Sequence, residues 1–302
     1  MSLTKKIDFA LILEVTNANP NGDPLNGNRP RADFQNYGEM TDVCLKRKIR
    51  DRLQDSGESI FVQSDEKKTD GMTSLKSRAE SEEYGLGKKA FQVKKGIEGS
   101  KQKDQTKNQA CQKWFDVRAF GQVFAFGKGD EGGSGVSIAI RGPVTIQSAF
   151  SVTPISITSN QIVKSVDSDE KEGKNARMGM KHRIDHGVYV AFGAMSPQLA
   201  ERTGFSDDDA KKIKAVLTKL FEGDASSARP EGSMQVLKLI WWEHNSKAGQ
   251  YSSAKVHGKL KEIIEEKIKN KSINGLIEDI TEEKLTVMGN GLSLKPEILD
   301  GF

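Results

Sequence analysis

Apolar residues along this 302-residue chain gather in short runs, and long polar stretches separate the runs. Residues 7–16 are almost continuously apolar and rich in β-forming residues, which predicts a buried central strand. Three more runs have the composition of strands: 136–152, 187–195 and 234–243. Residues 114–126 resume core-like patterning, and we expect this segment and 136–152 to form neighbouring strands. A short last strand is expected at 283–288.

Three segments carry the periodicity of amphipathic helices. A helix is predicted at 41–54, where apolar residues recur every four positions and either Thr41 or Asp42 can cap the first turn. Residues 206–221 form the clearest helical pattern, since they begin with a capping-box motif and acidic residues in the first turn. Residues 255–270 predict a third, charged amphipathic helix.

The polar stretches differ in kind. Residues 17–33 contain several Asn-Gly and Pro turn signals, so we expect a long, ordered and functional loop. Residues 62–113 are poor in aliphatic side chains, which predicts an insertion with weak or helical structure and no core of its own. Residues 159–183 lie between two β-rich runs, which predicts an extended hairpin that projects from the sheet.

The order of the elements indicates the fold class. Strand, helix, strands, helix, strand, helix and strand follow one another, and no internal repeat is visible. This order is compatible with an α+β protein that has a ferredoxin-like, or RNA-recognition-like, core with long insertions.

Composition narrows the class of protein. The 46 Lys and Arg residues slightly outnumber the 42 Asp and Glu residues, for a formal net charge of +4. No apolar run approaches the roughly 18 residues of a membrane-spanning helix, so we expect no membrane association. The chain starts without a secretory-signal pattern, and the two distant residues Cys44 and Cys111 cannot form a disulfide framework. We therefore expect a cytoplasmic protein.

Candidate catalytic and metal-binding patterns are weak. The glycine-rich run 127–135 lacks the Lys-Ser/Thr of a phosphate-binding loop and precedes a strand, which disfavours nucleotide hydrolysis. Asp23 and Asp33 could hold a metal ion or act on RNA, although turn formation is the simpler interpretation. His182 and His186 are four residues apart, but on a strand this spacing places them about 13 Å from each other. We expect neither a cofactor nor a metal site, and no enzyme activity.

Basic residues point to a polyanionic partner. Lys46, Arg47 and Arg50 share one arc of the helix at 41–54, away from its apolar stripe. This helix follows a loop that carries Arg29 and Arg31, and guanidinium groups beside backbone amides suit phosphates.

Two further basic segments strengthen this interpretation. Residues 86–113 contain eight Lys and two acidic residues, and 174–183 contain four basic residues and no acid. Met178 and Met180 interleave with the charges of the latter segment. Exposed Met among Arg and Lys suits contact with bases and phosphates together, although burial in the core or against a neighbouring subunit would also explain it.

Several motifs, in this order, resemble one family. They are Asn19-Pro20-Asn21-Gly22-Asp23-Pro24, Thr41-Asp42-Val43-Cys44-Leu45-Lys46-Arg47, Phe115-Asp116-Val117-Arg118, Ile140-Arg141-Gly142-Pro143 and Met178-Gly179-Met180-Lys181-His182-Arg183. Together they resemble the backbone RNA-binding subunit of the type I-C CRISPR interference complex (Cascade), over roughly residues 7–245.

The resemblance implies a hand-shaped single domain over 1–302. Its RNA-recognition-like palm would comprise about 7–61, 114–158 and 187–302. Its fingers would be the 62–113 insertion, and its thumb the 159–186 hairpin.

The resemblance also implies a role. Copies of the chain would stack head-to-tail along a CRISPR guide RNA, displace bases at intervals, and present the others to target DNA, together with other subunits of the complex. The residues expected to contact RNA are Asn19, Arg29, Arg31, Lys46, Arg47, Arg50, Arg118, Lys174, Arg177, Met178, Met180, Lys181, His182 and Arg183. The alternative is an endoribonuclease of the same superfamily that processes CRISPR RNA or cuts target RNA.

Overall fold

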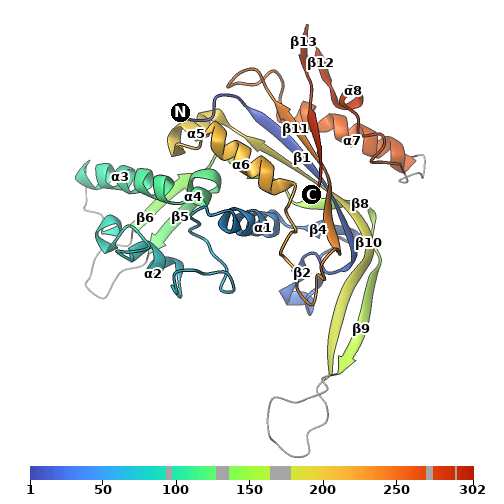
Figure 1. The fold of residues 1–302 in the computed structure, drawn as a ribbon, viewed down its shortest axis with the longest axis horizontal. Coiled ribbons are helices and arrows are strands. Elements are labelled where there is room, and N and C mark those ends of the chain that lie inside the picture. The colour runs from blue at the N-terminus through green and yellow to red at the C-terminus, as the bar shows by residue number, and fades with distance from the viewer. Residues whose placement is uncertain (93–96, 127–135, 164–177, 270–274, 290) are drawn as a thin grey trace, which may run out of the picture.

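A large antiparallel sheet forms the centre of the molecule (Figure 1). The computed structural model describes residues 1–302 except 93–96, 127–135, 164–177, 270–274 and 290. The strand order is β14-β11-β1-β10-β8-β4, and β7 and β9 also pair with β10. These strands are β1 (Ile7–Ala18), β4 (Tyr37–Met40), β7 (Val144–Ile146), β8 (Ala149–Pro154), β9 (Ile157–Val163), β10 (Met178–Met195), β11 (Met234–Glu243) and β14 (Glu297–Asp300).

The predicted central strand is confirmed as β1, which lies between β10 and β11. Successive side chains of a strand point to opposite faces of the sheet, and both faces are buried here. Leu11 and Leu13 enter one core cluster, whereas Ala10 and Ile12 enter the other. Burial on both faces explains why this run is almost continuously apolar.

Helices α1 and α6 help to build the core on the first face of the sheet. Both predictions are confirmed: α1 spans Asp42–Asp55 with Thr41 as its cap, and α6 spans Asp207–Leu217 with the expected capping box. The predicted apolar stripe of α1 is fully buried, and α5 (Pro197–Thr203) adds Ala200 to the same core.

Helix α7 (Ser253–Lys269), which is close to the predicted range, packs on the opposite face. The chain then forms α8 (Glu282–Leu285), β12 (Val287–Gly289) and β13 (Leu292–Leu294), so the strand predicted at 283–288 is half helix. None of the helices in the described part of the chain is both long and apolar enough to cross a membrane.

A buried polar network joins α7 to the end of β1. The Asp8 carboxylate is fully buried and accepts a hydrogen bond from His244 Nε2 at 2.8 Å. Burial alone would raise the pKa of Asp8, but hydrogen bonds from His244 and Ser253 and the charge of Lys6 lower it. His257 of α7 donates to the Gly193 carbonyl at 3.2 Å. Asp8 and Gly193 are far in sequence from His244 and α7, so no local pattern predicts this network.

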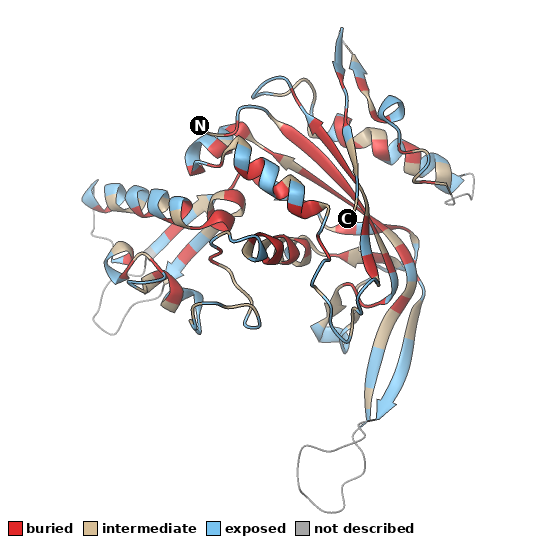
Figure 2. Cartoon of the chain, in the orientation of Figure 1, coloured by how far each residue is buried: buried red, intermediate tan, exposed pale blue. Residues whose placement is uncertain are grey.

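The central insertion (residues 62–113) is partly helical, as expected, and it shares a core with the segments that flank it. It contains α2 (Leu75–Glu80), a short 3-10 turn η2 (Lys88–Phe91) and α3 (Ile97–Lys113), and it packs on α4 (Phe115–Phe120), β5 (Gly121–Phe126) and β6 (Val136–Arg141). Phe61, Phe91, Trp114 and Phe124 are buried together in this third cluster. Figure 2 shows buried positions on the helices and strands of this part of the molecule. The apolar side chains that complete it come from the flanking segments, which is why the insertion alone gave no sign of a core. The expected pairing of the two flanking runs is confirmed for β5 and β6, but Phe115–Phe120 is helical.

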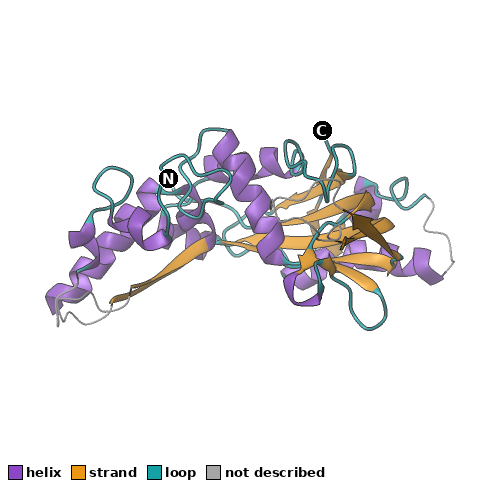
Figure 3. Ribbon diagram, turned by 90° about the horizontal axis from the view of Figure 1, so that it is seen from below, coloured by secondary structure: helices purple, strands orange, loops and turns teal. Residues whose placement is uncertain are grey.

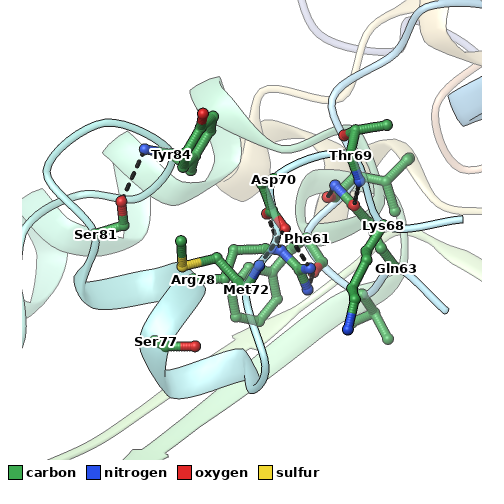
Figure 4. Close-up of polar contacts among 12 residues, drawn as sticks. Phe61, Gln63, Lys68, Thr69, Asp70, Met72, Ser77, Arg78, Ser81 and Tyr84 are labelled. Atoms are coloured by element: carbon green, nitrogen blue, oxygen red, sulfur yellow. Dashed lines mark hydrogen bonds and ion pairs between the residues drawn. The ribbon is translucent and has the colours of Figure 1, made fainter. Parts of the chain in front are cut away.

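A buried ion pair fixes the irregular first half of the central insertion (Figure 4). The Arg78 guanidinium pairs with Asp70 and also donates to the Phe61 carbonyl at 3.0 Å. Arg78 also donates a hydrogen bond to the Asp70 carboxylate, and this bond is the main reason why the pKa of Asp70 is lowered. The contacts tie α2 to the segment that enters the insertion.

The predicted extended hairpin projects from the sheet (Figure 1). Figure 3 views the molecule from below, along the direction in which the hairpin extends. We call residues 157–163 and 178–184, which pair in register from Ile157–Ile184 to Val163–Met178, the projecting hairpin. Strand β10 is 18 residues long, so one half of it belongs to the sheet and the other half to this hairpin.

Candidate nucleic-acid interface

The loop after β1 is ordered by its own Asn and Asp side chains. It contains β2 (Gly22–Asp23), a 3-10 turn η1 (Pro24–Asn26) and β3 (Arg29–Pro30), where the sequence suggested no regular element. Asn21 Oδ1 accepts hydrogen bonds from the backbone nitrogen and hydroxyl of Thr41 at 2.9 and 3.0 Å, which joins the loop to the start of α1. Asn28 and Asn36 adopt positive φ angles, which Asn tolerates better than most residues.

Asn19 belongs to this scaffold. Its side chain is buried, and Nδ2 donates to the Asn28 carbonyl at 2.7 Å. The amide therefore shapes the loop, and contact of Asn19 with RNA stays a prediction.

The two acidic residues of the loop make turns, as the simpler interpretation held. Asp23 accepts from the Leu25 nitrogen at 3.2 Å, and Asp33 Oδ1 accepts from the nitrogens of Gln35 and Tyr37, both at 2.9 Å. No group of three His, Cys, Asp or Glu residues with metal-binding geometry occurs in the described ranges.

Arg29 and Arg31 lie where the loop meets the projecting hairpin. Arg29 Nη1 donates to Ser159 Oγ at 3.3 Å, and Arg31 Nη2 lies 3.3 Å from Asp23 Oδ1. Both residues line a cavity of about 250 Å³ between the loop and Ile157 of the hairpin. The structure therefore brings these two predicted residues together with the hairpin.

The two faces of the projecting hairpin differ in chemistry. Residues directly opposite across an antiparallel pair share a face, and alternate residues of one strand do as well. One face carries Met178, Met180 and Val163, whose exposed fractions are 69%, 54% and 57%, together with Gln161 and His182. The other face carries Lys181 and Arg183 together with the exposed Ile162. Met and basic residues are interleaved in the sequence, but on the strand Met178 and Met180 point to one face and Lys181 and Arg183 to the other.

Two predicted residues of the hairpin segment, Lys174 and Arg177, lie outside the described residues. Within the described part, His182 Nδ1 is 2.8 Å from Ser159 Oγ, and His186 Nε2 is 2.9 Å from Glu14 Oε1. Both histidines are on strand β10, as expected, where their spacing does not suit a shared metal ion.

The basic residues of α1 have partners within the chain. Lys46 pairs with Asp42 at 2.9 Å across one helical turn. Arg47 pairs with Asp51 at 2.8 Å and donates to the Val62 carbonyl at 2.5 Å. Burial lowers the pKa of Arg47, although Asp51 acts in the opposite direction.

Two further predicted residues are structural. Arg50 pairs with the buried Asp116 at 2.9 Å, and Arg118 pairs with Asp209 at 2.8 Å. The side chains of Arg50 and Arg118 are only 13% and 16% exposed, and their ion pairs connect α1 and α6 to α4. Contact of the two residues with RNA stays a prediction. The helical pattern could not reveal the ion pairs, since the acidic partners of both lie far away in sequence.

Comparisons with known proteins match most of the chain. The family model described as CRISPR-associated protein Cas7 matches residues 5–286. A curated relative, CRISPR-associated protein Cas7 of Haloferax volcanii, is 25% identical over 244 residues, which cover 75% of this chain and 67% of the relative.

Solved structures show a more distant likeness. A chain of a CRISPR RNA-guided surveillance complex in a pre-nicking state is 13% identical, with a TM-score of 0.45 and 78% of each chain covered. A chain of another CRISPR RNA-guided surveillance complex is 13% identical, with a TM-score of 0.40, and 78% of this chain matches 68% of that one. A chain of the Type III-B Cmr-beta complex bound to cognate target RNA is 11% identical, with a TM-score of 0.40, and 78% of this chain spans 60% of that chain.

Proposed function

The chain belongs to the Cas7 family of CRISPR-associated proteins, and from this premise we propose that it is a non-catalytic backbone subunit that oligomerises along a CRISPR guide RNA. Its motifs resemble those of the type I-C interference complex, and we assign it to that subtype. Its partners are then the guide RNA, further copies of itself arranged head-to-tail, the other subunits of the complex, and target DNA. We place this assembly in the cytoplasm, where guide and target meet.

We assign the strands that surround the core helices to an RNA-recognition-like palm. The order β11-β1-β10-β8, with α1 after β1 and α6 after β10, is the strand order 4-1-3-2 of a ferredoxin-like unit. In this assignment the central insertion is the fingers and the projecting hairpin is the thumb.

The observation that carries the proposal is the projecting hairpin with its two faces. Lys181 and Arg183 supply charge for phosphates, while Met178 and Met180 present apolar surface of a size that contacts base faces. An apolar face this exposed is unfavourable in an isolated subunit, and a nucleic acid strand would cover it. Arg29 at the base of the hairpin extends the basic surface onto the loop.

The turn-making roles of Asp23 and Asp33 favour a scaffold over a ribonuclease. Carboxylates that accept backbone hydrogen bonds within their own turns stabilise those turns, and this accounts for their presence without catalysis.

The proposal is tested by measuring the mass of the protein in solution with and without a guide-length RNA. We expect oligomers whose mass grows with RNA length, and an intact RNA after incubation with Mg²⁺. A monomer that cleaves the RNA would instead establish the ribonuclease alternative. An unchanged mass without cleavage would reject RNA-templated assembly.

A further inference from the structure

The Ser159 hydroxyl joins the projecting hairpin to the loop after β1. Arg29 Nη1 donates to Ser159 Oγ at 3.3 Å, and His182 Nδ1 lies 2.8 Å from the same oxygen. Ser159 and His182 are opposite each other on the two strands of the hairpin, whereas Arg29 belongs to β3. One oxygen atom therefore holds two basic side chains from separate elements next to each other.

A hydroxyl group can keep both contacts in either charge state of the histidine, because it has one donor and two acceptor sites. When Ser159 Oγ accepts from Arg29, its hydrogen is free to donate to Nδ1 of a neutral His182. When His182 is protonated, Nδ1 donates instead, and Oγ accepts from both side chains. The arrangement of the three groups is therefore compatible with a change of charge on His182.

Both basic side chains keep donors for a ligand. In the described part of the chain, His182 Nε2 makes no hydrogen bond, and the Arg29 side chain makes none besides the one from Nη1 to Ser159. Because Nδ1 of the neutral imidazole accepts from the hydroxyl, Nε2 carries a hydrogen atom in both charge states. The pair thus presents only donors, and a phosphate group, which presents only acceptors, is the matching ligand.

The strands of the hairpin place no carboxylate against His182. Strand β9 (Ile157–Val163), which pairs with this part of β10, contains no ionisable residue. The neighbours of His182 on β10, Lys181 and Arg183, point to the opposite face of the hairpin. The hairpin itself therefore does not neutralise a charge on His182.

The carboxylates of the loop after β1 and of β4 do not neutralise it either. Beyond Arg29, the charged residues on this side line the cavity beside the hairpin, and they are Asp23, Arg31, Asp33 and Glu39. Asp23 lies 3.3 Å from Arg31, and Asp33 accepts from two backbone nitrogens. None of these carboxylates forms an ion pair with His182 among the residues that the structure describes.

His186 has the opposite surroundings. It lies on the same strand, but its Nε2 is 2.9 Å from Glu14 Oε1. A carboxylate at this distance compensates a charge on the imidazole before any phosphate can do so. His186 is therefore a natural control for His182.

We propose that the Ser159 hydroxyl positions Arg29 and His182 as a clamp for one phosphate of a bound single strand, and that protonation of His182 strengthens the clamp. The inference rests on the proposed function, since the phosphate belongs to the RNA. It adds a positioning residue, Ser159, and a dependence of RNA affinity on pH. Affinity rises as the pH falls, because a negative phosphate stabilises the charged imidazole and a charged donor makes a hydrogen bond roughly twice as strong as a neutral one.

The first test uses the unmodified protein and 12-nucleotide oligouridine. Fluorescence anisotropy gives the affinity at about pH 8 and about pH 5.5, the interval in which histidine gains its charge. We expect binding to be about tenfold tighter at the lower pH, as a hydrogen bond to a neutral donor becomes one to a charged donor. Equal affinities at the two pH values would overturn the proposal, and this comparison does not depend on whether any variant folds.

The histidine variants locate the titrating group. His182→Gln keeps a side chain that can form hydrogen bonds but does not titrate, so the gain in affinity at the lower pH should disappear. His186→Gln is the matched control and should keep the gain. A gain that survives His182→Gln in a folded protein would contradict the assignment.

The Ser159 variants test positioning. Ser159→Ala removes the shared oxygen, so the gain should fall below about threefold, because His182 is no longer held beside Arg29. Ser159→Thr keeps the hydroxyl on a side chain that suits a strand, and it should retain the full gain. An alanine variant with the full gain would show that Ser159 does not position the clamp.

Arg29→Ala tests whether both groups meet the same phosphate. At about pH 8 the slope of log K against log salt should be flatter than in the wild type by about 0.7, since one phosphate contact is lost. At about pH 5.5 this difference should vanish, because protonated His182 then neutralises that phosphate. A slope that stays flatter at both pH values would show that His182 meets no phosphate.

The outcomes separate this inference from the proposed function. Wild-type protein that binds oligouridine equally at both pH values rejects the clamp and leaves the proposed function standing. Wild-type protein that binds no RNA at either pH rejects the proposed function, and the clamp with it.

Discussion

The central insertion and the projecting hairpin are both polar segments inserted between elements of the palm-forming part of the chain. They differ in the burial of their apolar side chains. In the insertion, Phe91 is buried and packs in one core with Phe61, Trp114 and residues of β5 and β6. The hairpin leaves Met178 and Met180 more than half exposed. Composition does not separate the two segments clearly, since each combines polar and basic residues with some apolar side chains. What separates them is whether flanking elements offer a surface on which apolar side chains can pack.

This difference suggests that the core of the insertion serves the stability of the fold, whereas the hairpin serves contact with a partner. A segment that shares a core with flanking elements contributes to the folding free energy, so substitutions in that core should lower the stability of the protein. A two-stranded hairpin that buries little contributes almost nothing to stability, so its sequence is free to serve a partner. The variants below test this division.

The largest effect on stability is expected from Trp114→Ala. The Trp114 ring is 1% exposed, and its centroid lies 4.7 Å from that of Phe61. Truncation should cost about 3–5 kcal/mol and lower the melting temperature by roughly 10 °C. Met178→Ala in the hairpin should change stability by less than about 0.5 kcal/mol. Thermal denaturation followed by circular dichroism gives both melting temperatures. Similar decreases for the two variants would contradict the proposed difference between the core and the hairpin.

The largest effect on assembly is expected from shortening the hairpin. Removal of residues 161–180, with a Gly-Ser turn joining Asn160 to Lys181, keeps the hairpin pairs nearest the sheet. The melting temperature should stay within about 2 °C, because the removed side chains that are described are mostly exposed. Growth of the oligomer with RNA length should disappear, while a short oligonucleotide still binds. Loss of folding would show that the hairpin is part of the core after all.

A smaller effect should appear when the pH is lowered. Asp70 has a lowered pKa in the folded protein, mainly because Arg78 donates to it. The unfolded chain therefore binds the proton more tightly, and the ion pair stabilises the insertion above the ordinary Asp pKa of about 3.9. This stabilisation is lost as the pH falls through and below that value. The melting temperature of the wild type should exceed that of Asp70→Asn at pH 7, and the difference should shrink towards pH 3. A difference that is constant over this range would contradict the assigned role of the pair.

These contrasts show which parts of the molecule its sequence reveals. The main strands and helices follow from local patterns within 11–14 residues, because α1 and α6 each bury one periodic face and β1 is almost continuously apolar, with both of its faces buried. The core of the insertion does not, since Phe61 and Phe124 come from outside the polar stretch. In the candidate site, the turn-rich loop indicated the position of Arg29 and Arg31 but not their contacts with Ser159 and Asp23. The ion pairs of Arg50 and Arg118 could not be predicted, because a helical pattern shows which way a guanidinium group points but not which carboxylate it meets.

A modest electrostatic effect is expected from the basic face of the hairpin. Lys181→Ala combined with Arg183→Ala should flatten the dependence of log K on log salt by about 1.4 units, since each phosphate contact on a single strand contributes about 0.7. Stability should not change. Lys211→Ala combined with Lys259→Ala removes the same charge from α6 and α7 and should leave the slope as it is. An equal change for both pairs would mean that net charge, rather than this face, controls binding.

The smallest and most specific effect concerns the apolar face of the hairpin. Met178 and Met180 stand two residues apart on one strand, so they present a continuous apolar surface with Val163 opposite. Inserting such a surface between bases costs a few kcal/mol of stacking per step, and neighbouring contacts must offset this cost. Changing both residues to Ser should therefore leave overall affinity nearly unchanged, because the loss of apolar contact and the relief of unstacking act in opposite directions.

What should change is the regular pattern of stacked and unstacked bases along the RNA. With a fluorescent base analogue walked through the strand, the emission of the wild-type assembly should rise at regular intervals, where bases are unstacked, and this pattern should fade in the double variant. Met288→Ser, which alters an equally exposed methionine on β12, should retain the pattern. Uniform emission in the wild-type assembly would show that the exposed methionines contact another protein surface instead, and the hairpin would then serve subunit contacts alone.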